Sequence, residues 1–276
     1  MNFEKATWRL LHTPPASGAW NMALDEAILE ATGQGLVPPT LRLYAWEPPC
    51  LSLGYAQPFA DADQHALAQH GWDLVRRPTG GRAILHTDEL TYSVSAPPTE
   101  PRIAGSVLES YHRLAQALLN ALHLLAVPAE AEEKYSLPEG ANPKGPVCFE
   151  VPSNWEITVD GKKLIGSAQV RRQMGVLQHG SIPLVGDLAR ITQALSFPDE
   201  AARAEAATRL LARASTVETA LGRVVSWEET AKALEAAFAQ TLNLVLVREE
   251  ITAWETDRAG MLVNEKYGNL EWTGRI

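Results

Sequence analysis

Cys148 is the side chain in this sequence best suited to covalent catalysis. A thiolate is a strong nucleophile, but a free thiol with a pKa of ~8.5 is only a few per cent ionised at neutral pH. Lys163 and Arg171 follow on a predicted hairpin, where an ammonium group would favour the thiolate. A lone cysteine is more often a small buried hydrophobe. Both interpretations of Cys148 therefore stay open on this feature alone.

Three arginines and two adjacent glycines lie in one short segment, Arg76–Arg82. Gly80 and Gly81 would let backbone N–H groups approach a ligand closely. The guanidinium groups of Arg76, Arg77 and Arg82 offer forked donors for phosphate or carboxylate. The spacing matches neither the dinucleotide fingerprint nor the phosphate loop with its Lys-Ser/Thr pair. A glycine turn with solvated arginines explains the composition equally well.

A third candidate is the strand-like segment that runs from Lys163 to Gln169. Alternation along a strand divides it into two faces: Lys163, Ile165 and Ser167 on one, and Lys162, Leu164 and Gly166 on the other. A glycine inside a strand indicates a bulge or a backbone that must lie close to a ligand. The alternative is an ordinary hairpin with solvated lysines.

The remaining candidates are isolated side chains. His86 and His179 are each able to assist proton transfer, although a lone histidine is more often structural. No His, Cys and carboxylate cluster has metal-ligand spacing, so we expect no metal and no cofactor. The absence of a Gly-x-Ser-x-Gly element excludes an ordinary serine hydrolase. Cys50, between two predicted strands, is expected to be a small core or near-site residue.

The elements that must position these residues alternate between strand-like and helix-like patterns. Neighbouring strands are predicted at Leu41–Trp46 and Leu51–Tyr55, and further strands at Leu74–Val75 and Leu90–Ser95. Helices are predicted at Gly18–Ala31, Asp61–His70, Ala201–Ala214 and Ser226–Leu242. Ser106 and Glu109 form a capping box for another helix. Its expected apolar face is Val107, Leu108, Tyr111, Leu114, Leu118, Leu122 and Leu125.

The middle of the chain combines a loop with a meander. Residues 130–147 are rich in proline, glycine and charge without any period, which predicts a long surface loop that leads to Cys148. Asp160-Gly161 between Trp155–Val159 and Lys163–Val170 is typical of a two-residue hairpin turn. A third strand at Val176–Leu184 would complete the meander.

Length and composition restrict the class of protein. The 276 residues suffice for one large domain or two small ones, and 46% hydrophobic with 21% charged residues is typical of globular proteins. A net charge of −9 argues against nucleic-acid binding. The sequence contains no apolar run long enough to cross a membrane and no secretory signal. We therefore expect a cytoplasmic α+β protein with a largely antiparallel sheet flanked by helices and a helical C-terminal part.

The ordered set of segments resembles the lipoate–biotin protein ligase superfamily, and within it the octanoyltransferases with a cysteine nucleophile (the LipM type). The resemblance covers nearly the whole chain. The segments that carry it are Asn21–Glu26, Leu41–Trp46, Ser52–Gln57, Arg76–His86, Cys148–Ser153, Lys163–Ala168, His179-Gly180, Lys266-Tyr267 and Trp272. It implies a ligase-like catalytic domain over residues 1–250 with a C-terminal extension, 251–276, packed on it.

Departures from the ATP-dependent lipoate ligases favour the transferases. Those ligases usually follow the double arginine with three glycines and a His-Asp pair, whereas here Arg82 replaces the third glycine and Thr87 follows His86. A ligase that works through an adenylate needs no thiol. Cys148, fifteen positions before Lys163, is similar to the transferase arrangement.

The resemblance implies that Cys148 is the acyl-thioester nucleophile and Lys163 its activating cation. It also implies a set of substrate-binding residues: Arg76, Arg77, Gly80, Gly81, Arg82, His86, Gly166, Ser167, Ala168 and His179. The implied donor is octanoyl-acyl carrier protein, and the implied acceptor is a lysine of a lipoyl domain, such as the glycine cleavage H protein. Acyl carrier proteins are acidic, so a local basic face is expected from Arg76, Arg77, Lys144, Arg171 and Arg172.

Three other functions remain open from the sequence. The chain could be an ATP-dependent lipoate or octanoate ligase, an amidotransferase between lipoyl domains, or a non-catalytic lipoyl-domain-binding protein on the same fold. Pyrophosphate release would identify the ligase. Saturable binding without an adduct on Cys148 would identify the binding protein.

Overall fold

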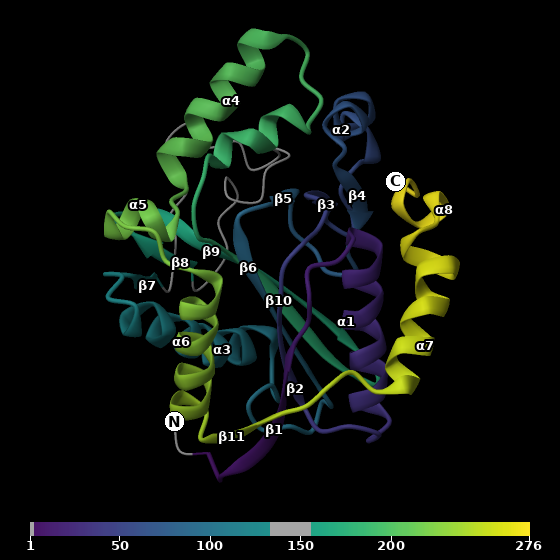
Figure 1. Cartoon of the computed structure of the whole chain (residues 1–276), viewed down its shortest axis with the longest axis vertical. Coiled ribbons are helices and arrows are strands. Elements are labelled where there is room, and N and C mark those ends of the chain that lie inside the picture. The colour runs from purple at the N-terminus through teal and green to yellow at the C-terminus, as the bar shows by residue number, and fades with distance from the viewer. Residues whose placement is uncertain (1–2, 133–155) are drawn as a thin grey trace.

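An eight-stranded mixed sheet forms the centre of the molecule (Figure 1). The computed structural model describes residues 3–132 and 156–276. Strand β1 (Ala6–His12) lies parallel to both β11 (Leu244–Arg248) and β2 (Thr40–Tyr44). The other neighbours are antiparallel and continue the sheet in this order: β6 (Glu89–Ala96), β10 (Gly175–Pro183), β9 (Lys162–Arg172), β8 (Glu156–Val159) and β7 (Glu130–Glu132).

A smaller sheet of three strands supplies the arginine-glycine segment. Its order is β4 (Asp73–Arg76), β3 (Cys50–Leu53) and β5 (Ile84–His86). The expectation that Leu41–Trp46 and Leu51–Tyr55 are neighbouring strands is therefore wrong. β2 pairs within the large sheet, whereas β3 pairs only with β4 and β5 among the described strands. The chain leaves the large sheet after Tyr44, through the segment that contains Pro48 and Pro49, which cannot donate backbone hydrogen bonds to a sheet.

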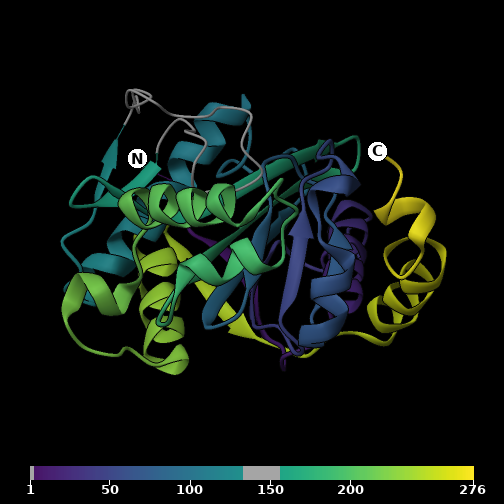
Figure 2. The same ribbon diagram turned by 90° about the horizontal axis from the view of Figure 1, so that it is seen from above.

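Helices cover both faces of the large sheet. Helices α1 (Gly18–Gly33) and α7 (Ala253–Leu262) lie on one side, and α3 (Val107–Leu124) and α6 (Trp227–Thr241) on the other, in Figure 1 and in the view from above in Figure 2. Leu10 and Leu11, which are adjacent on β1, belong to two different core clusters. Alternate residues of the strand therefore fill two separate cores.

Four shorter elements pack around the three-stranded sheet: η1 (Phe59–Asp61), α2 (Gln64–His70), η3 (Leu188–Gln193) and α4 (Glu200–Arg213). Helix α5 (Val217–Leu221) instead packs in the core of the large sheet. Helix α2 begins at Gln64, later than predicted, because Asp63 caps it, and it ends as predicted at Gly71 with φ +65°.

The local sequence signals explain several elements directly. The capping box of Ser106 and Glu109 is present at the start of α3. Asp160 and Gly161 both have positive φ, +50° and +71°, as a two-residue hairpin turn between β8 and β9 requires. The apolar face of α3 is only partly as predicted, because Val107 and Leu108 are exposed while Leu114, Leu118 and Leu122 are buried. The first turn of the helix extends beyond the edge of the core.

The bulge predicted at Gly166 lies two residues earlier in β9. Ile157 pairs with Ile165 while Thr158 pairs with Lys163, which leaves Leu164 as the extra residue. Leu164 and Ile165 consequently both belong to the core beneath α3. The predicted division of these two residues between opposite faces is wrong because a bulge interrupts the strict alternation of a strand.

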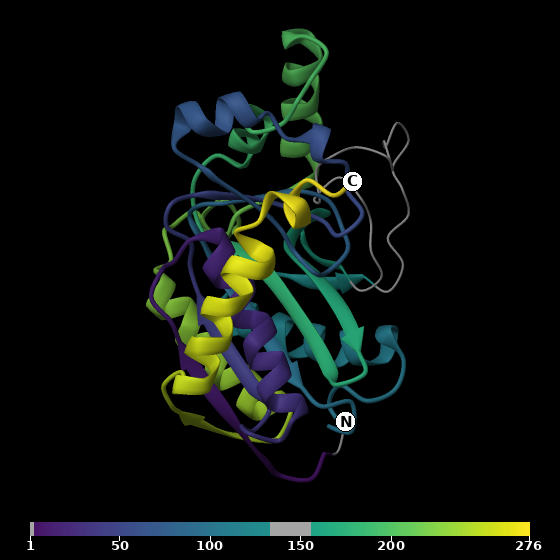
Figure 3. The ribbon, with the colours of Figure 1, turned by 90° about the vertical axis from the view of Figure 1, so that its right-hand side faces the viewer.

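The C-terminal residues pack on α1 (Figure 3). They form α7, a π-helical turn η4 (Val263–Tyr267) and α8 (Leu270–Thr273). A fully buried ion pair between Arg9 and Glu255 joins β1 to α7. Strand β11, which precedes this segment, lies in the predicted helical C-terminal part and was not predicted from the sequence. The division into residues 1–250 and 251–276 stays a prediction.

Two further observations concern the described part of the chain. None of its helices combines the length and the apolar character needed to cross a bilayer. The predicted loop at 130–147 begins with strand β7, and the rest of that loop, like Lys144 and Cys148, lies outside the described residues.

Candidate active site

A pocket lies where the two sheets meet and brings together half of the predicted site residues. The predicted residues that line it are Arg77, His86, Gly166, Ser167, Ala168 and His179. Helix α1 adds Met22, the small sheet adds Ser52 and Ile84, and the large sheet adds Tyr44, Thr91, Gly180 and Ser181. Segments that are distant in sequence therefore converge on one cavity with small residues along one wall.

The first polar chain in this pocket runs from Ser52 through His86 to Glu89. His86 Nε2 lies 2.8 Å from Ser52 Oγ, and His86 Nδ1 lies 2.7 Å from Glu89 Oε1. The imidazole stacks on Trp46 with ring centroids 3.9 Å apart. Burial acts to raise the pKa of Glu89, but His86 and two hydroxyl donors outweigh it, so the pKa lies below its usual value. Glu89 is a fixed carboxylate that orients the ring.

A second chain runs from Thr79 through His179 to Asp25. Thr79 Oγ1 lies 2.7 Å from His179 Nε2, and His179 Nδ1 lies 3.4 Å from Asp25 Oδ2. Burial is the largest influence on His179 and lowers its pKa. The imidazole is therefore neutral at neutral pH. Because an ionised carboxylate only accepts hydrogen bonds, the ring proton belongs on Nδ1 and the Thr79 hydroxyl donates to Nε2.

Asp25 is held ionised by its surroundings. Arg42 Nη1 lies 2.8 Å from Asp25 Oδ1, and Tyr44 and Ser93 donate their hydroxyls at 2.9 and 2.8 Å. Burial acts to raise the pKa of Asp25, but the Arg42 charge, His179 and the Ser93 hydroxyl lower it overall. The result is a rigid, fully buried acceptor for His179.

Arg77 connects the pocket to the glycine loop. Its Nη1 donates to Ser52 O and Ser52 Oγ at 2.9 and 3.0 Å, and its Nη2 donates to Gly80 O and Arg82 O at 3.0 and 2.6 Å. The loop from Gly80 to Arg82 is thus held by a buried guanidinium. Gly54 packs against the same loop, and a Cβ added to it would lie 1.9 Å from Gly81 O.

Arg76 does not lie in the pocket, in contrast to the sequence expectation. It is fully buried, and it donates to Gly54 O at 2.8 Å, Gln57 O at 2.6 Å and Thr273 O at 2.9 Å. Successive residues of a strand point to opposite sides, so Arg77 reaches the pocket and Arg76 joins the scaffold to the C-terminal helix. Burial of Arg76 and Arg77 also removes both from the expected basic face.

The glycine loop lines a second, more open hollow. Gly80, Gly81 and Arg82 line it together with Tyr55, Ala56, Gln57, Pro78, Val170 and Arg172. The predicted residues therefore divide between two neighbouring places, the enclosed pocket and this hollow.

Lys163 lies near the pocket on β9, three residues before Gly166. It is only 5% exposed, and its Nζ lies 2.6 Å from Glu156 Oε1 on β8. Cys148 lies outside the described residues, so the predicted pairing of its thiol with the Lys163 ammonium stays a prediction. Cys50 is fully buried, and burial, followed by the charges of Asp73 and Glu89, raises the pKa of its thiol. This environment does not favour a thiolate at Cys50.

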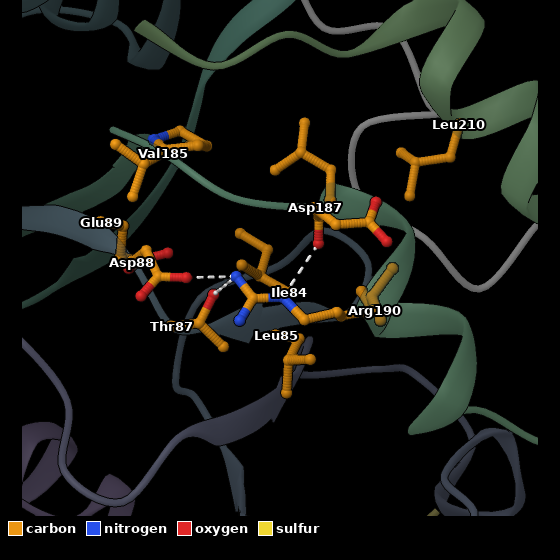
Figure 4. A pocket seen from close by; sticks show the side chains of 12 residues that line it. Ile84, Leu85, Thr87, Asp88, Glu89, Val185, Asp187, Arg190 and Leu210 are labelled. Carbon is orange, nitrogen blue, oxygen red and sulfur yellow. Dashed lines mark hydrogen bonds and ion pairs between the residues drawn. The ribbon is translucent and has the colours of Figure 1, made fainter. Parts of the chain in front are cut away.

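An adjacent pocket beyond Glu89 is less suited to catalysis (Figure 4). Arg190 crosses it and forms an ion pair with Asp88, and it also donates to Thr87 Oγ1 at 3.1 Å. Its charge is thereby used within the protein. In the part of the chain that the structure describes, no group of three or more His, Cys, Asp or Glu side chains is placed to hold a metal ion.

The sequence prediction missed Asp25, Ser52, Thr79 and Glu89. One signal pointed toward Asp25: Arg42 lies between two leucines in an apolar strand, and a buried arginine needs an acidic partner. Nothing local in the sequence identifies that partner as a residue of the first helix.

Comparisons with known proteins identify the family of this chain. The family model for the lipoyl protein ligase A/B catalytic domain matches residues 17–239. Octanoyltransferase LipM of Kyrpidia tusciae is 42% identical over 98% of this chain and 99% of its own length. The protein of the same name from Symbiobacterium thermophilum has the same identity and the same shares.

Two solved structures are similar along their full length. The bipartite lipoate protein ligase of Thermoplasma acidophilum has a TM-score of 0.81 at 26% identity, with 98% of each chain covered. A lipoate-protein ligase A bound with ATP has a TM-score of 0.77 at 26% identity, with 99% of this chain and all of that chain covered. The expected ligase-like fold is confirmed. The chain belongs to the lipoyl protein ligase A/B catalytic family and, within it, to the octanoyltransferases of the LipM kind.

Proposed function

We propose that this octanoyltransferase moves octanoate from octanoyl-acyl carrier protein to a lipoyl-domain lysine through a thioester on Cys148. In the first step the Cys148 thiolate attacks the donor thioester, the carrier thiolate leaves and takes up a proton, and the acyl group passes from sulfur to sulfur. In the second step the lysine amine attacks octanoyl-Cys148, an amide forms and the Cys148 thiol is released. Thioester to amide is downhill, so the reaction needs no ATP.

Lys163 supports this proposal more than any other described residue. Lys163 is buried on the strand that supplies Gly166 and Ala168 to the pocket, three residues before Gly166. There it would stabilise the Cys148 thiolate before each attack and the developing oxyanion during it. The Glu156 carboxylate would hold the ammonium in position.

The Thr79–His179–Asp25 chain would serve the second step. An attacking amine must lose a proton as the amide forms. His179 lines the pocket, whereas the fully buried Thr79 does not, so the imidazole is the group of this chain that an amine in the pocket would reach. Because His179 is neutral and backed by the Asp25 carboxylate, it is able to take up that proton.

The location of the enzyme is part of the proposal. A catalytic thiol must stay reduced, and the cytoplasm keeps thiols reduced. We therefore place the reaction in the cytoplasm, with Cys50 and Cys148 both as free thiols.

The test is transfer of octanoate to a purified lipoyl domain in the absence of nucleotide. Wild-type protein is expected to transfer from octanoyl-acyl carrier protein with ping-pong kinetics, and Cys148→Ala is expected to lose transfer. Cys50→Ala serves as the matched control and should retain it. Transfer that requires ATP and free octanoate, with pyrophosphate release, would identify a ligase instead. Octanoate uptake from an octanoylated lipoyl domain would identify an amidotransferase.

A further inference from the structure

One face of β9 joins the enclosed pocket to the open hollow at the glycine loop. Gly166 and Ala168 line the pocket, and Val170 and Arg172 line the hollow. These residues are spaced by two in a segment that pairs with β10 without irregularity, so they share a face. Gly166 and Arg172 lie about 20 Å apart along the strand at ~3.3 Å per residue. The two cavities are therefore the ends of one track with a floor of small residues at its inner end.

The outer end of this track carries cations without acidic partners. Arg82 and Arg172 form no ion pair or side-chain hydrogen bond with any described residue. The Arg172 side chain is exposed, and that of Arg82 is half-buried. Arg275 forms no ion pair with a described residue either. Its Nη2 donates to Tyr55 O at 3.0 Å, and its guanidinium lies 3.7 Å from the Tyr55 ring centroid and 4.1 Å from that of Trp272.

This concentration of unpaired charge stands out against the rest of the protein. The chain has a net charge of −9, and several arginines elsewhere are paired with carboxylates, as in Arg9–Glu255, Arg42–Asp25 and Arg258–Glu30. Arg275, followed by Arg172 and Lys266, lowers the pKa of the Tyr55 phenol. The hollow is therefore locally positive on an acidic protein, which favours an anionic ligand at this position.

The backbone of the glycine loop adds donors to this charge. The N–H groups of Gly80 and Gly81 make no hydrogen bond to any described residue. A Cβ added to Gly80 would have no heavy atom within 4 Å, so the loop is open on that side. Guanidinium groups beside free backbone N–H groups are typical of a phosphate site.

We propose that the track from Arg172 to Gly166 binds the phosphopantetheine arm of the donor, with its phosphodiester at Arg82, Arg172 and Arg275. This inference rests on the proposed function, since it names how the carrier-protein donor is held. The arm is a narrow extended chain that joins a phosphate at one end to the acyl thioester at the other. The track has the same arrangement, with cations at its outer end and the pocket at its inner end. A fixed separation between anion and thioester favours the arm over the acidic surface of the carrier protein.

The test compares three donors that differ only beyond the pantetheine: octanoyl-pantetheine, octanoyl-4′-phosphopantetheine and octanoyl-acyl carrier protein. Formation of octanoyl-Cys148 is measured as kcat/KM for each. We expect Arg172→Gln to lower the kcat/KM of each phosphate-bearing donor, divided by the kcat/KM of octanoyl-pantetheine, by about tenfold or more. The reason is the loss of a charge-assisted hydrogen bond to the phosphate. Arg172→Lys should restore part of that ratio.

Arg223→Gln is the matched control. Arg223 is an exposed arginine paired with Glu229, away from the track, and its substitution should leave the ratio unchanged. An unchanged ratio in Arg172→Gln would overturn the inference. A loss confined to octanoyl-acyl carrier protein would also overturn it, because the cations would then contact the carrier's protein surface. If wild-type protein forms no adduct with any donor, the proposed function fails as well. If the adduct forms with the same kcat/KM whether or not the donor carries the phosphate, this inference alone is refuted.

Discussion

Substitutions in the Lys163–Glu156 pair are expected to move the pKa of the Cys148 thiol in opposite directions. The two side chains form an ion pair at 2.6 Å, with only 5% of Lys163 and 3% of Glu156 exposed. An ammonium near a thiolate stabilises it, and a carboxylate on that ammonium offsets part of the effect. Lys163→Met should therefore raise the thiol pKa, and Glu156→Gln should lower it.

The expected magnitudes follow from the burial of this pair. Removal of one member of a buried ion pair costs about 3–5 kcal/mol of stability, so each single variant is strongly destabilised. The double variant should lose less stability than the sum of the two single losses, because it leaves no unpaired charge of this pair buried. For the thiol, a shift of the pKa from ~7 to ~8.5 reduces the thiolate at pH 7 from about half to about 3%, a loss of about 15-fold.

The assay is the rate of Cys148 alkylation by iodoacetamide between pH 5 and 9, followed by peptide mass. A Cys50→Ala background removes the second thiol. Thermal melts identify a temperature at which every variant is folded. Lys162→Met is the control, since Lys162 Nζ donates to Leu211 O at 2.8 Å on the surface. If both pair variants keep the wild-type profile, or shift it in the same direction, Lys163 does not activate this thiol.

Three further outcomes are expected from residues around the site. Cys50→Ala should retain transfer and lose about 1 kcal/mol of stability, measured by urea unfolding, because its buried thiol only packs; loss of transfer would contradict this. Burial lowers the pKa of His179, so the unfolded chain takes up its proton first and stability falls as the pH drops below ~6.5. His179→Gln should reduce that fall between pH 7 and 5, and equal falls would refute the assignment. Gly54→Ala should cost about 1–3 kcal/mol and impair transfer, since its Cβ would displace Gly81, and an unchanged urea midpoint would count against the close contact.

The elements with local signals were predictable from the sequence. Helix α3 follows from its capping box and leucine spacing, and the β8–β9 hairpin follows from Asp160-Gly161. The pairing of β1 with β11 was not predictable in the same way. It joins residues such as Ala6 and Leu244, and β11 is a short strand between two helical segments.

The site could be located from the sequence but not assembled from it. The segments at Arg77, Gly166 and His179 were recognised as candidates, and all three line one pocket. Their buried acidic partners depend on which faces meet in the folded protein. Asp25, for example, reaches His179 from 154 positions away.

The covalent intermediate tests the central claim most directly. Purified protein is mixed with octanoyl-acyl carrier protein without nucleotide, its intact mass is recorded, and a lipoyl domain is then added. The proposed mechanism predicts one octanoyl group on Cys148 that passes to the lipoyl-domain lysine, and no such mass in Cys148→Ala. Wild-type protein that transfers octanoate without ever carrying it on Cys148 would contradict the mechanism.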